Sequence, residues 1–327
     1  MLDKLNVLQL GWQSTFGTAQ GTATKKLSRV SSFSLKPELE TRALDQLRGT
    51  LVTHQTALDH YASSATFESA DTTFEEINYF LEMLFGTDAS VTGTAAPYVR
   101  DYAAPTTAQP TPHFATLQFG QTDEVWQMQD ATVTSLTLSG AANSGVSVGA
   151  SLMGGKVIAG ALQSLADVTT GTRMTGCMAS VAIETWAGNT FTPLASSAFS
   201  WELSVNANRE YHNFLGECTP TASYDNKWSG QLKLSLELNT STDDYLIAML
   251  AAANTILEKQ VRIIYTVGSS TTLRSMTLTF AGHTMQAPEL FQDKNGLMTY
   301  DLVLDGVYNP TLTNWLTIET KAALAAV

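Results

Sequence analysis

Apolar and polar residues alternate along many short stretches of the chain, with the two-residue period of a half-buried β-strand. The alternation is clearest at residues 146–152, 199–205 and 232–238. Because each such stretch is short, the pattern favours a mainly β protein built from many strands. The same pattern predicts further strands at residues 30–35, 61–67, 117–119, 133–138, 261–267, 273–280 and 298–304.

Two segments have the spacing of an amphipathic helix instead. The first begins at residues 72–75 and the second at 241–244, where a hydroxyl and a following acid suit a helix N-terminus. We therefore expect each helix to pack its apolar stripe against a sheet. The stripes are Phe74, Ile77, Leu81, Leu84 and Phe85 in the first helix and Leu246, Met249, Leu250, Ala253 and Leu257 in the second.

The order of strands, one helix and more strands occurs twice, which predicts an internal duplication. The triplet Phe-Ser-Leu at 33–35 recurs as Phe-Ser-Trp at 199–201, an offset of 166 residues. Tyr79 and Tyr245, in the two predicted helices, are separated by the same offset. A fixed offset across two separate elements favours one ancestral unit that is present twice.

A long insertion distinguishes the first copy from the second. Residues 135–138 and 275–278 match at an offset of 140, which is 26 residues less than the offset before the helix. The segment 87–112 has this length and is rich in Pro, Ala and Thr. We expect an extended loop that forms no packed strand or helix and acts as an arm in assembly. Its marker residues are Thr87, Pro97, Pro105, Pro110 and Pro112.

The length of 327 residues suits two domains of about 160 residues, each able to build a core. We predict tandem domains at residues 1–170 and 171–327, each a β-sandwich or small barrel flanked by one α-helix. Nine basic and 16 acidic residues give the first a charge of −7, and nine and 14 give the second −5. Since nucleic-acid binding depends on Lys and Arg neutralising phosphates, the excess of acidic residues argues against a protein that binds DNA or RNA.

Other sequence features exclude several classes of protein. Cys177 and Cys218 have no metal-ligand or disulfide-framework spacing, so we expect ordinary small residues. Residues 1–6 carry charges and Asn where a signal peptide has an apolar run. The longest apolar stretch without charge, 245–253, is far shorter than the ~20 residues that span a bilayer. We expect a soluble protein made in a cytoplasm.

No motif in the chain requires an enzyme. The glycine-rich segment 149–157 has Ala150 and Val157 where a phosphate loop needs Gly and a hydroxyl residue. His54 and His60 could share one strand face, but no third metal ligand accompanies them. The paired carboxylates at 75–76 and 243–244 are interpreted as first-turn acids. We therefore expect no cofactor, metal or catalytic residue.

The N-terminal part of the chain resembles the tail tube (major tail) proteins of long-tailed bacteriophages. Residues 11–19 read Gly-Trp-Gln-Ser-Thr-Phe-Gly-Thr-Ala, followed by the strand at 30–35 and the Glu-Leu-Glu-Thr segment at 38–41. The helix that ends at 79–86 is similar to the helix of that family in position and character. The resemblance covers about the first 90 residues best, and the second copy resembles the family through its order of elements.

The resemblance implies a structural virion protein without enzymatic activity. In that family a β-sandwich with a flanking helix joins its inner strands to those of neighbours, forming a barrel around a channel for DNA. Duplicated members form trimeric, pseudo-hexameric rings that stack into a tube. The implied partners are further copies of this chain, a tape measure protein inside, and tail terminator and tip proteins at the ends. The implied location is the virion, after synthesis in the bacterial cytoplasm.

Two further expectations complete this interpretation. Outward-facing acids of the alternating strands would make the channel wall negative, and the candidates are Glu40, Glu202 and Glu237. The main alternative is a carbohydrate- or receptor-binding β-sandwich protein of a virion or cell surface, in which Trp12, Trp186 or Trp228 would stack on sugars. A two-domain hydrolase without a recognisable motif is a weaker alternative.

Overall fold

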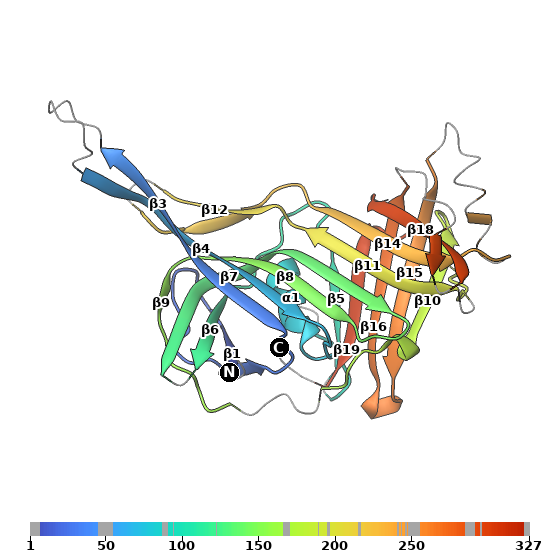
Figure 1. Cartoon of the computed structure of the whole chain (residues 1–327), viewed down its shortest axis with the longest axis horizontal. Coiled ribbons are helices and arrows are strands. Elements are labelled where there is room, and N and C mark those ends of the chain that lie inside the picture. Colours follow the sequence, from blue (N-terminus) through green and yellow to red (C-terminus); the bar gives the residue numbers. More distant parts are fainter. Residues whose placement is uncertain are drawn as a thin grey trace.

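The protein is built almost entirely of antiparallel β-strands, as the alternating sequence pattern predicts (Figure 1). The computed structural model describes residues 7–44, 55–86, 91–93, 95–121, 123–165, 171–188, 190–194, 197–214, 217–240, 242, 244–245, 247, 256–284, 292–294 and 296–323. The prediction of a mainly β fold is confirmed.

The described elements of the first half, residues 1–170, include one α-helix and nine strands. This helix is α1 (Ile77–Phe85). The strands are β1 (Val7–Trp12), β2 (Lys25–Leu27), β3 (Ser32–Leu44), β4 (Gln55–Ser69), β5 (Tyr98–Ala103), β6 (Ala115–Gln121), β7 (Glu124–Ala141), β8 (Ser147–Gly154) and β9 (Val157–Ala159).

The second half, residues 171–327, contains the remaining strands and two short 3₁₀ helices, η1 (Gly176–Met178) and η2 (Ser270–Thr272). The helix predicted from 241–244 onward falls largely outside the described residues. The strands are β10 (Ala179–Thr185), β11 (Ala198–Asn206), β12 (Arg209–His212), β13 (Ala222–Asp225), β14 (Ser229–Glu237), β15 (Glu258–Val267), β16 (Arg274–His283), β17 (Gln292–Lys294), β18 (Leu297–Gly306) and β19 (Leu316–Ala322).

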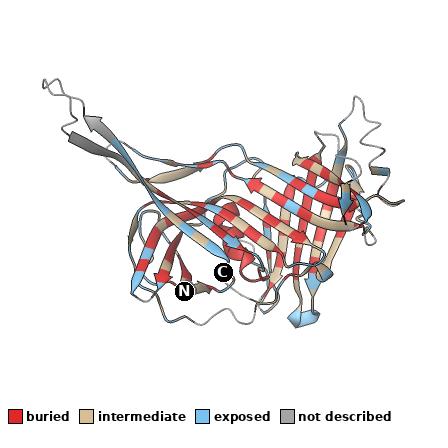
Figure 2. Ribbon diagram, viewed as in Figure 1, coloured by how far each residue is buried: buried red, intermediate tan, exposed pale blue. Residues whose placement is uncertain are grey.

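One continuous run of strands crosses both halves, in the order β3, β4, β8, β7, β11, β14, β18. The junction between the halves is the antiparallel pair β7–β11, in which residues 135–141 face residues 200–206. One face of this run carries buried apolar side chains and the other carries polar ones, so burial alternates along the strands (Figure 2). We call this run the main sheet.

The two halves have the same strand order. In the first half the pairing order is β3, β4, β8, β7, β6, β1. In the second it is β11, β14, β18, β16, β15, β10. β17 pairs with the start of β18 and β16 with its end, so β16 and β17 together take the place of the long strand β7.

The helix α1 is buried on every side, and its nine residues are all inaccessible. The apolar side of α1 carries the apolar residues predicted from the sequence. At the predicted start of the helix, Thr73 accepts a hydrogen bond from the Glu76 amide. Its polar side is enclosed because Asn78 accepts hydrogen bonds from Tyr102 of β5 and Thr320 of β19. An element of the second half therefore covers the helix of the first half.

The prediction that 87–112 holds no packed strand is wrong for residues 98–103. This stretch forms β5, which pairs antiparallel with β19 across residues 317–322. Pro97 and Pro105 lie just outside the strand, so they do not interrupt its hydrogen bonds. The sequence prediction was based on the proline content of the whole segment and therefore missed this short run of aromatic and β-branched residues.

The match between residues 135–138 and 275–278 does not join equivalent positions. The first segment pairs with β8 and β11, whereas the second pairs with β15 and β19. The insertion in the first half nevertheless lies between α1 and β6, where the sequence places it.

Candidate functional site

The solvent-facing side of the main sheet is a continuous polar surface, which we call the polar face. Side chains directly opposite each other on antiparallel strands point to the same side. Ser139, Glu202 and Lys233 are such neighbours on β7, β11 and β14, so all three lie on the polar face. Their chain neighbours Leu138, Leu203 and Leu232 point into the core.

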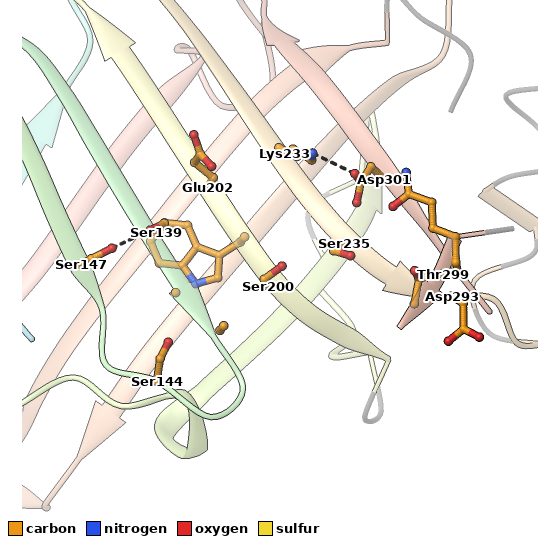
Figure 3. Close-up of a pocket in the computed structure, with 14 residues that line it drawn as sticks. Ser139, Ser144, Ser147, Ser200, Glu202, Lys233, Ser235, Asp293, Thr299 and Asp301 are labelled. Carbon is orange, nitrogen blue, oxygen red and sulfur yellow. Dashed lines mark hydrogen bonds and ion pairs between the residues drawn. The ribbon is translucent and has the colours of Figure 1, made fainter. Parts of the chain in front are cut away.

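Small hydroxyl side chains occupy the centre of the polar face. Ser139 and Ser147 share a hydrogen bond of 2.6 Å, as do Ser34 and Thr66 at 2.7 Å. These short side chains leave a shallow hollow of about 450 Å³ beside Glu202 (Figure 3). A surface of neutral hydroxyls and carboxylates has few positive charges that could hold a passing anion.

The charged side chains described on the polar face are predominantly acidic. Two lysines are partly neutralised there: Lys233 forms an ion pair with Asp301 at 2.8 Å, and Lys36 lies 3.9 Å from Glu38. The remaining acids keep the face negative. The acidic residues on it are Glu38, Glu40, Glu68, Glu202, Glu237, Asp301 and Asp305, against the basic residues Lys36 and Lys233.

The sequence-predicted acids Glu40, Glu202 and Glu237 all lie on the polar face. Glu40 and Glu202 are exposed, whereas Glu237 is half-buried. They come from β3, β11 and β14, which belong to the same sheet but to both halves of the chain. The structure thus brings the three candidates onto one surface.

The predicted assembly loop divides into a buried and an exposed part. Tyr102 of β5 and the following Ala104 are buried, whereas residues 106–109 are exposed. The exposed part borders an open groove whose other walls include Trp228 and Tyr308. Of the loop markers, Thr87 lies outside the described residues, and Pro97, Pro105, Pro110 and Pro112 are half-buried. The longest run of exposed residues described in the loop is 106–109.

Two arginines, the buried Arg209 and the half-buried Arg274, join the halves, and sequence reasoning did not single out either. Arg209 and Asp225 form a bidentate ion pair, with 2.5 and 2.9 Å between nitrogen and oxygen atoms. Arg274 of β16 donates from Nε to Glu75 just before α1, at 3.1 Å. No local sequence motif marks these residues, because their partners are 125–199 positions away or across a hairpin.

The sequence predicts that the adjacent acids Glu75 and Glu76 are first-turn acids of the helix, but both precede its first turn. Both are buried, and α1 begins only at Ile77. Glu75 accepts from Arg274 and from the Thr172 amide, while Glu76 accepts from the amide and hydroxyl of Ser28. Each carboxylate therefore fixes a different distant segment beside the helix.

The tryptophans proposed as sugar platforms are each half-buried. Trp12 stacks on His113 with ring centroids 3.9 Å apart. Trp228 packs against Phe85 and donates from Nε1 to Asp225 at 3.1 Å. At least Trp12 and Trp228 thus have partners within the fold, which weakens the carbohydrate-binding alternative.

The glycine-rich segment 149–157 belongs to strands β8 and β9, and no helix follows it as a phosphate loop requires. His54 lies outside the described residues, and His60 lies in β4. Within the described ranges, no group of three or more His, Cys, Asp or Glu residues could hold a metal ion. No helix in those ranges is long and apolar enough to cross a membrane. Cys177 and Cys218 are exposed and unbridged.

Comparison with protein families gives one extended match. The family described as phage tail tube protein matches residues 4–302, which is nearly the whole chain. The match includes strands from both halves of the main sheet and both Arg209 and Arg274. No curated protein matches the chain.

Proposed function

The chain belongs to the phage tail tube protein family, and from this premise we propose that it polymerises as stacked rings around a channel through which DNA passes into the host. The polar face of the main sheet lines this channel. The observation that carries the proposal is that the polar face spans both halves of the chain, has an excess of acidic residues, and is rich in small hydroxyl residues. The side chains on the opposite face of the main sheet are buried in the hydrophobic core.

The charge of the polar face suits transit without binding. DNA carries one negative charge per ≈ 1.7 Å of its axis, so a wall of carboxylates repels it and offers no phosphate-binding sites. The net charge of −12 extends this repulsion to the whole subunit. In this proposal Glu40, Glu202 and Glu237 face the lumen.

We further propose that the domains are residues 1–170 and 171–327 and that they arose by duplication. The identical strand order of the two halves supports this. Three chains would then supply six similar units to one ring. Such a ring requires each unit to present an edge that matches the opposite edge of the next unit.

The remaining roles follow from the same proposal. The exposed segment 106–109 contacts neighbouring subunits, while β5 belongs to the fold. A tape measure protein occupies the channel during assembly, and terminator and tip proteins close the ends. The chain is made in the bacterial cytoplasm, functions in the virion tail and performs no catalysis.

Electron microscopy of the purified protein tests the proposal. We expect hollow tubes or rings whose mass per ring equals three chains. Monomers at all concentrations and ionic strengths, or compact oligomers without a central hole, would contradict it.

A further inference from the structure

The segment 13–17, in the middle of the N-terminal motif, holds a buried aspartate of β7. Gln13 accepts a hydrogen bond from the Asp130 amide at 3.1 Å, and its Nε2 donates to the Thr18 carbonyl at 3.0 Å. Gly17 donates its amide to the Asp130 carboxylate at 2.7 Å. A φ of 78° at Gly17 favours glycine at this position. The motif therefore forms a loop that binds both the side chain and the backbone of one residue.

The same aspartate also receives a residue of the second half. The hydroxyl of Tyr211 in β12 donates to the backbone carbonyls of Asp130 and Met153, the latter at 3.2 Å. Phe16 packs edge-on against the Tyr211 ring, with the ring centroids 5.9 Å apart. We call this cluster the clasp, and its members are Gln13, Phe16, Gly17, Asp130 and Tyr211. The clasp ties the hairpin β12–β13 to the first half.

The other end of this hairpin reaches the outer part of the hairpin β3–β4. Residues 63–69 of β4 pair with β8, whereas residues 55–62 pair with β3 alone among the described strands. We call residues 38–44 and 55–62 the ribbon, which projects beyond the body of the protein in Figure 1. The Tyr61 amide donates to the Cys218 carbonyl, in the connection between β12 and β13, at 2.8 Å. The hairpin β12–β13 therefore contacts the ribbon at one end and the rest of the clasp at the other.

The ribbon needs support from outside its own two strands. A two-stranded ribbon in water is marginally stable, so its direction depends on the contacts at its base. The Tyr61 hydroxyl exchanges hydrogen bonds with the amide and carbonyl of Val157 in β9, at 3.2 Å each, which gives one support. The Cys218 carbonyl gives a second support to the backbone of the same residue. Release of the hairpin β12–β13 from the body would remove this second support.

We propose that the hairpin β12–β13 is a brace that fixes the direction of the ribbon, and that the clasp locks this brace to the body. The role of the brace in assembly rests on the proposed function. Identical subunits of a ring or tube must present each projecting segment in the same direction. A ribbon that is already fixed loses less conformational freedom when a tube forms. Subunits with an open clasp should therefore fold but assemble more slowly.

Two spin labels measure the direction of the ribbon in the soluble subunit. One label is attached at Thr41→Cys on the ribbon and the other at Ser144→Cys on the exposed turn between β7 and β8. The background carries Cys177→Ser and Cys218→Ser, which keeps the backbone carbonyl at position 218. Pulsed electron–electron double resonance should then give a narrow distribution of distances between the labels. This measurement requires no tubes.

The substitution Tyr211→Phe opens the clasp with little change of shape, because it removes only the hydroxyl. The distance distribution should become about twice as wide, since the ribbon loses its second support. The matched control is Tyr224→Phe in the same hairpin. Tyr224 lies on the opposite face of the hairpin and donates to Glu210. The control should keep the narrow distribution, and equal widths for the two variants would contradict the brace.

Hydrogen exchange gives a second readout that requires no label. The Tyr61 amide should exchange about tenfold faster in Tyr211→Phe than in the wild type, while the amides of residues 148–152 in β8 stay protected. An unchanged distance distribution or an unchanged exchange rate would overturn the inference and leave the proposed function intact. A wider distribution with wild-type rates of tube formation would refute the role of the brace in assembly. A wild-type chain that never forms tubes would contradict the proposed function and that role together.

Discussion

Arg209 and Asp225 face each other across the pair β12–β13 and form an ion pair whose side chains are 0% and 2% exposed. The same guanidinium donates to the carbonyls of Met83 and Leu84, at 2.9 Å each, at the end of α1. A helix C-terminus carries unsatisfied carbonyls and a partial negative charge, so a cation is favourable there. A residue of the second half thus caps the helix of the first.

Removing Arg209 should destabilise the whole chain. The substitution Arg209→Ala leaves Asp225 as a buried charge and removes a donor from the carbonyls of Met83, Leu84 and Val133. Breaking a buried pair in this way costs about 3–5 kcal/mol. Arg209→Lys should lose less, because it keeps the charge but not the planar fork. Urea denaturation of the soluble subunit measures both changes.

The control for this substitution is Arg173→Ala. Arg173 forms an ion pair with Asp71 at 2.8 Å, but their side chains are 51% and 36% exposed. Such a pair contributes about 0–1 kcal/mol. Similar losses for the two variants would show that Arg209 does not join the halves as described.

Asp130 should make the stability depend on pH. Its burial raises the pKa of the carboxyl, although a 2.7 Å hydrogen bond from the Gly17 amide opposes this. A raised pKa means that the folded state favours the protonated acid. The stability it confers is therefore full below the ordinary Asp pKa and is lost as the pH rises through the raised value.

The substitution Asp130→Asn tests this sign. Asn has no charge to bury and tolerates the positive φ of 55° at this position. The unfolding free energy of the variant minus that of the wild type should increase from pH 4 to pH 8. A difference that stays constant or falls across this range would contradict the burial of an ionisable Asp130.

The exposed part of the insertion should affect assembly without affecting the fold. Replacing residues 106–108 by Gly-Ser-Gly leaves β5 and its buried Tyr102 in place, so the melting temperature should change by no more than a few degrees. Tube formation should be lost or reduced at least tenfold in electron micrographs. Deleting 98–103 should instead unfold the protein. Normal tubes from the Gly-Ser-Gly variant would refute an assembly role for this segment.

Reversing charges on the polar face should make the channel bind DNA. Tubes that carry Glu68→Lys and Glu202→Lys should retain DNA at low salt and release it as the salt concentration rises, because phosphate contacts release counterions. The matched variant Glu124→Lys with Glu217→Lys has the same net charge on residues outside the polar face. Equal DNA retention by both variants, measured by co-sedimentation with open tubes, would show that the polar face does not line the channel.

The strands and the first helix could be predicted from the sequence because their signal is local. Leu232, Leu234 and Leu236 alternate with polar residues, and this alternation alone specifies a strand with one buried face. The acids Glu40, Glu202 and Glu237 could be placed on the outward side by the same rule. Whether these acids from different strands lie on one face depends on the order of the strands in the sheet. The alternation of apolar and polar residues does not specify that order.

The contacts that join the halves could not be predicted, because they depend on partners distant in sequence. Burial of Arg209 and Glu75 contradicts the ordinary preference of charged residues for solvent, and only the folded arrangement supplies their partners. Strand β5 was missed because the prolines around it dominate the composition of 87–112. A window centred on Tyr98 and Val99 could have found it.

A cryo-electron microscopy reconstruction of the assembled tube is the most direct measurement. We predict three chains per ring, six similar sandwiches around one hole, and the polar face with Glu202 turned toward the lumen. Within each chain, the pair β7–β11 should join two of the six units. Six chains per ring, or a lumen lined by any other face of the subunit, would contradict the proposed function.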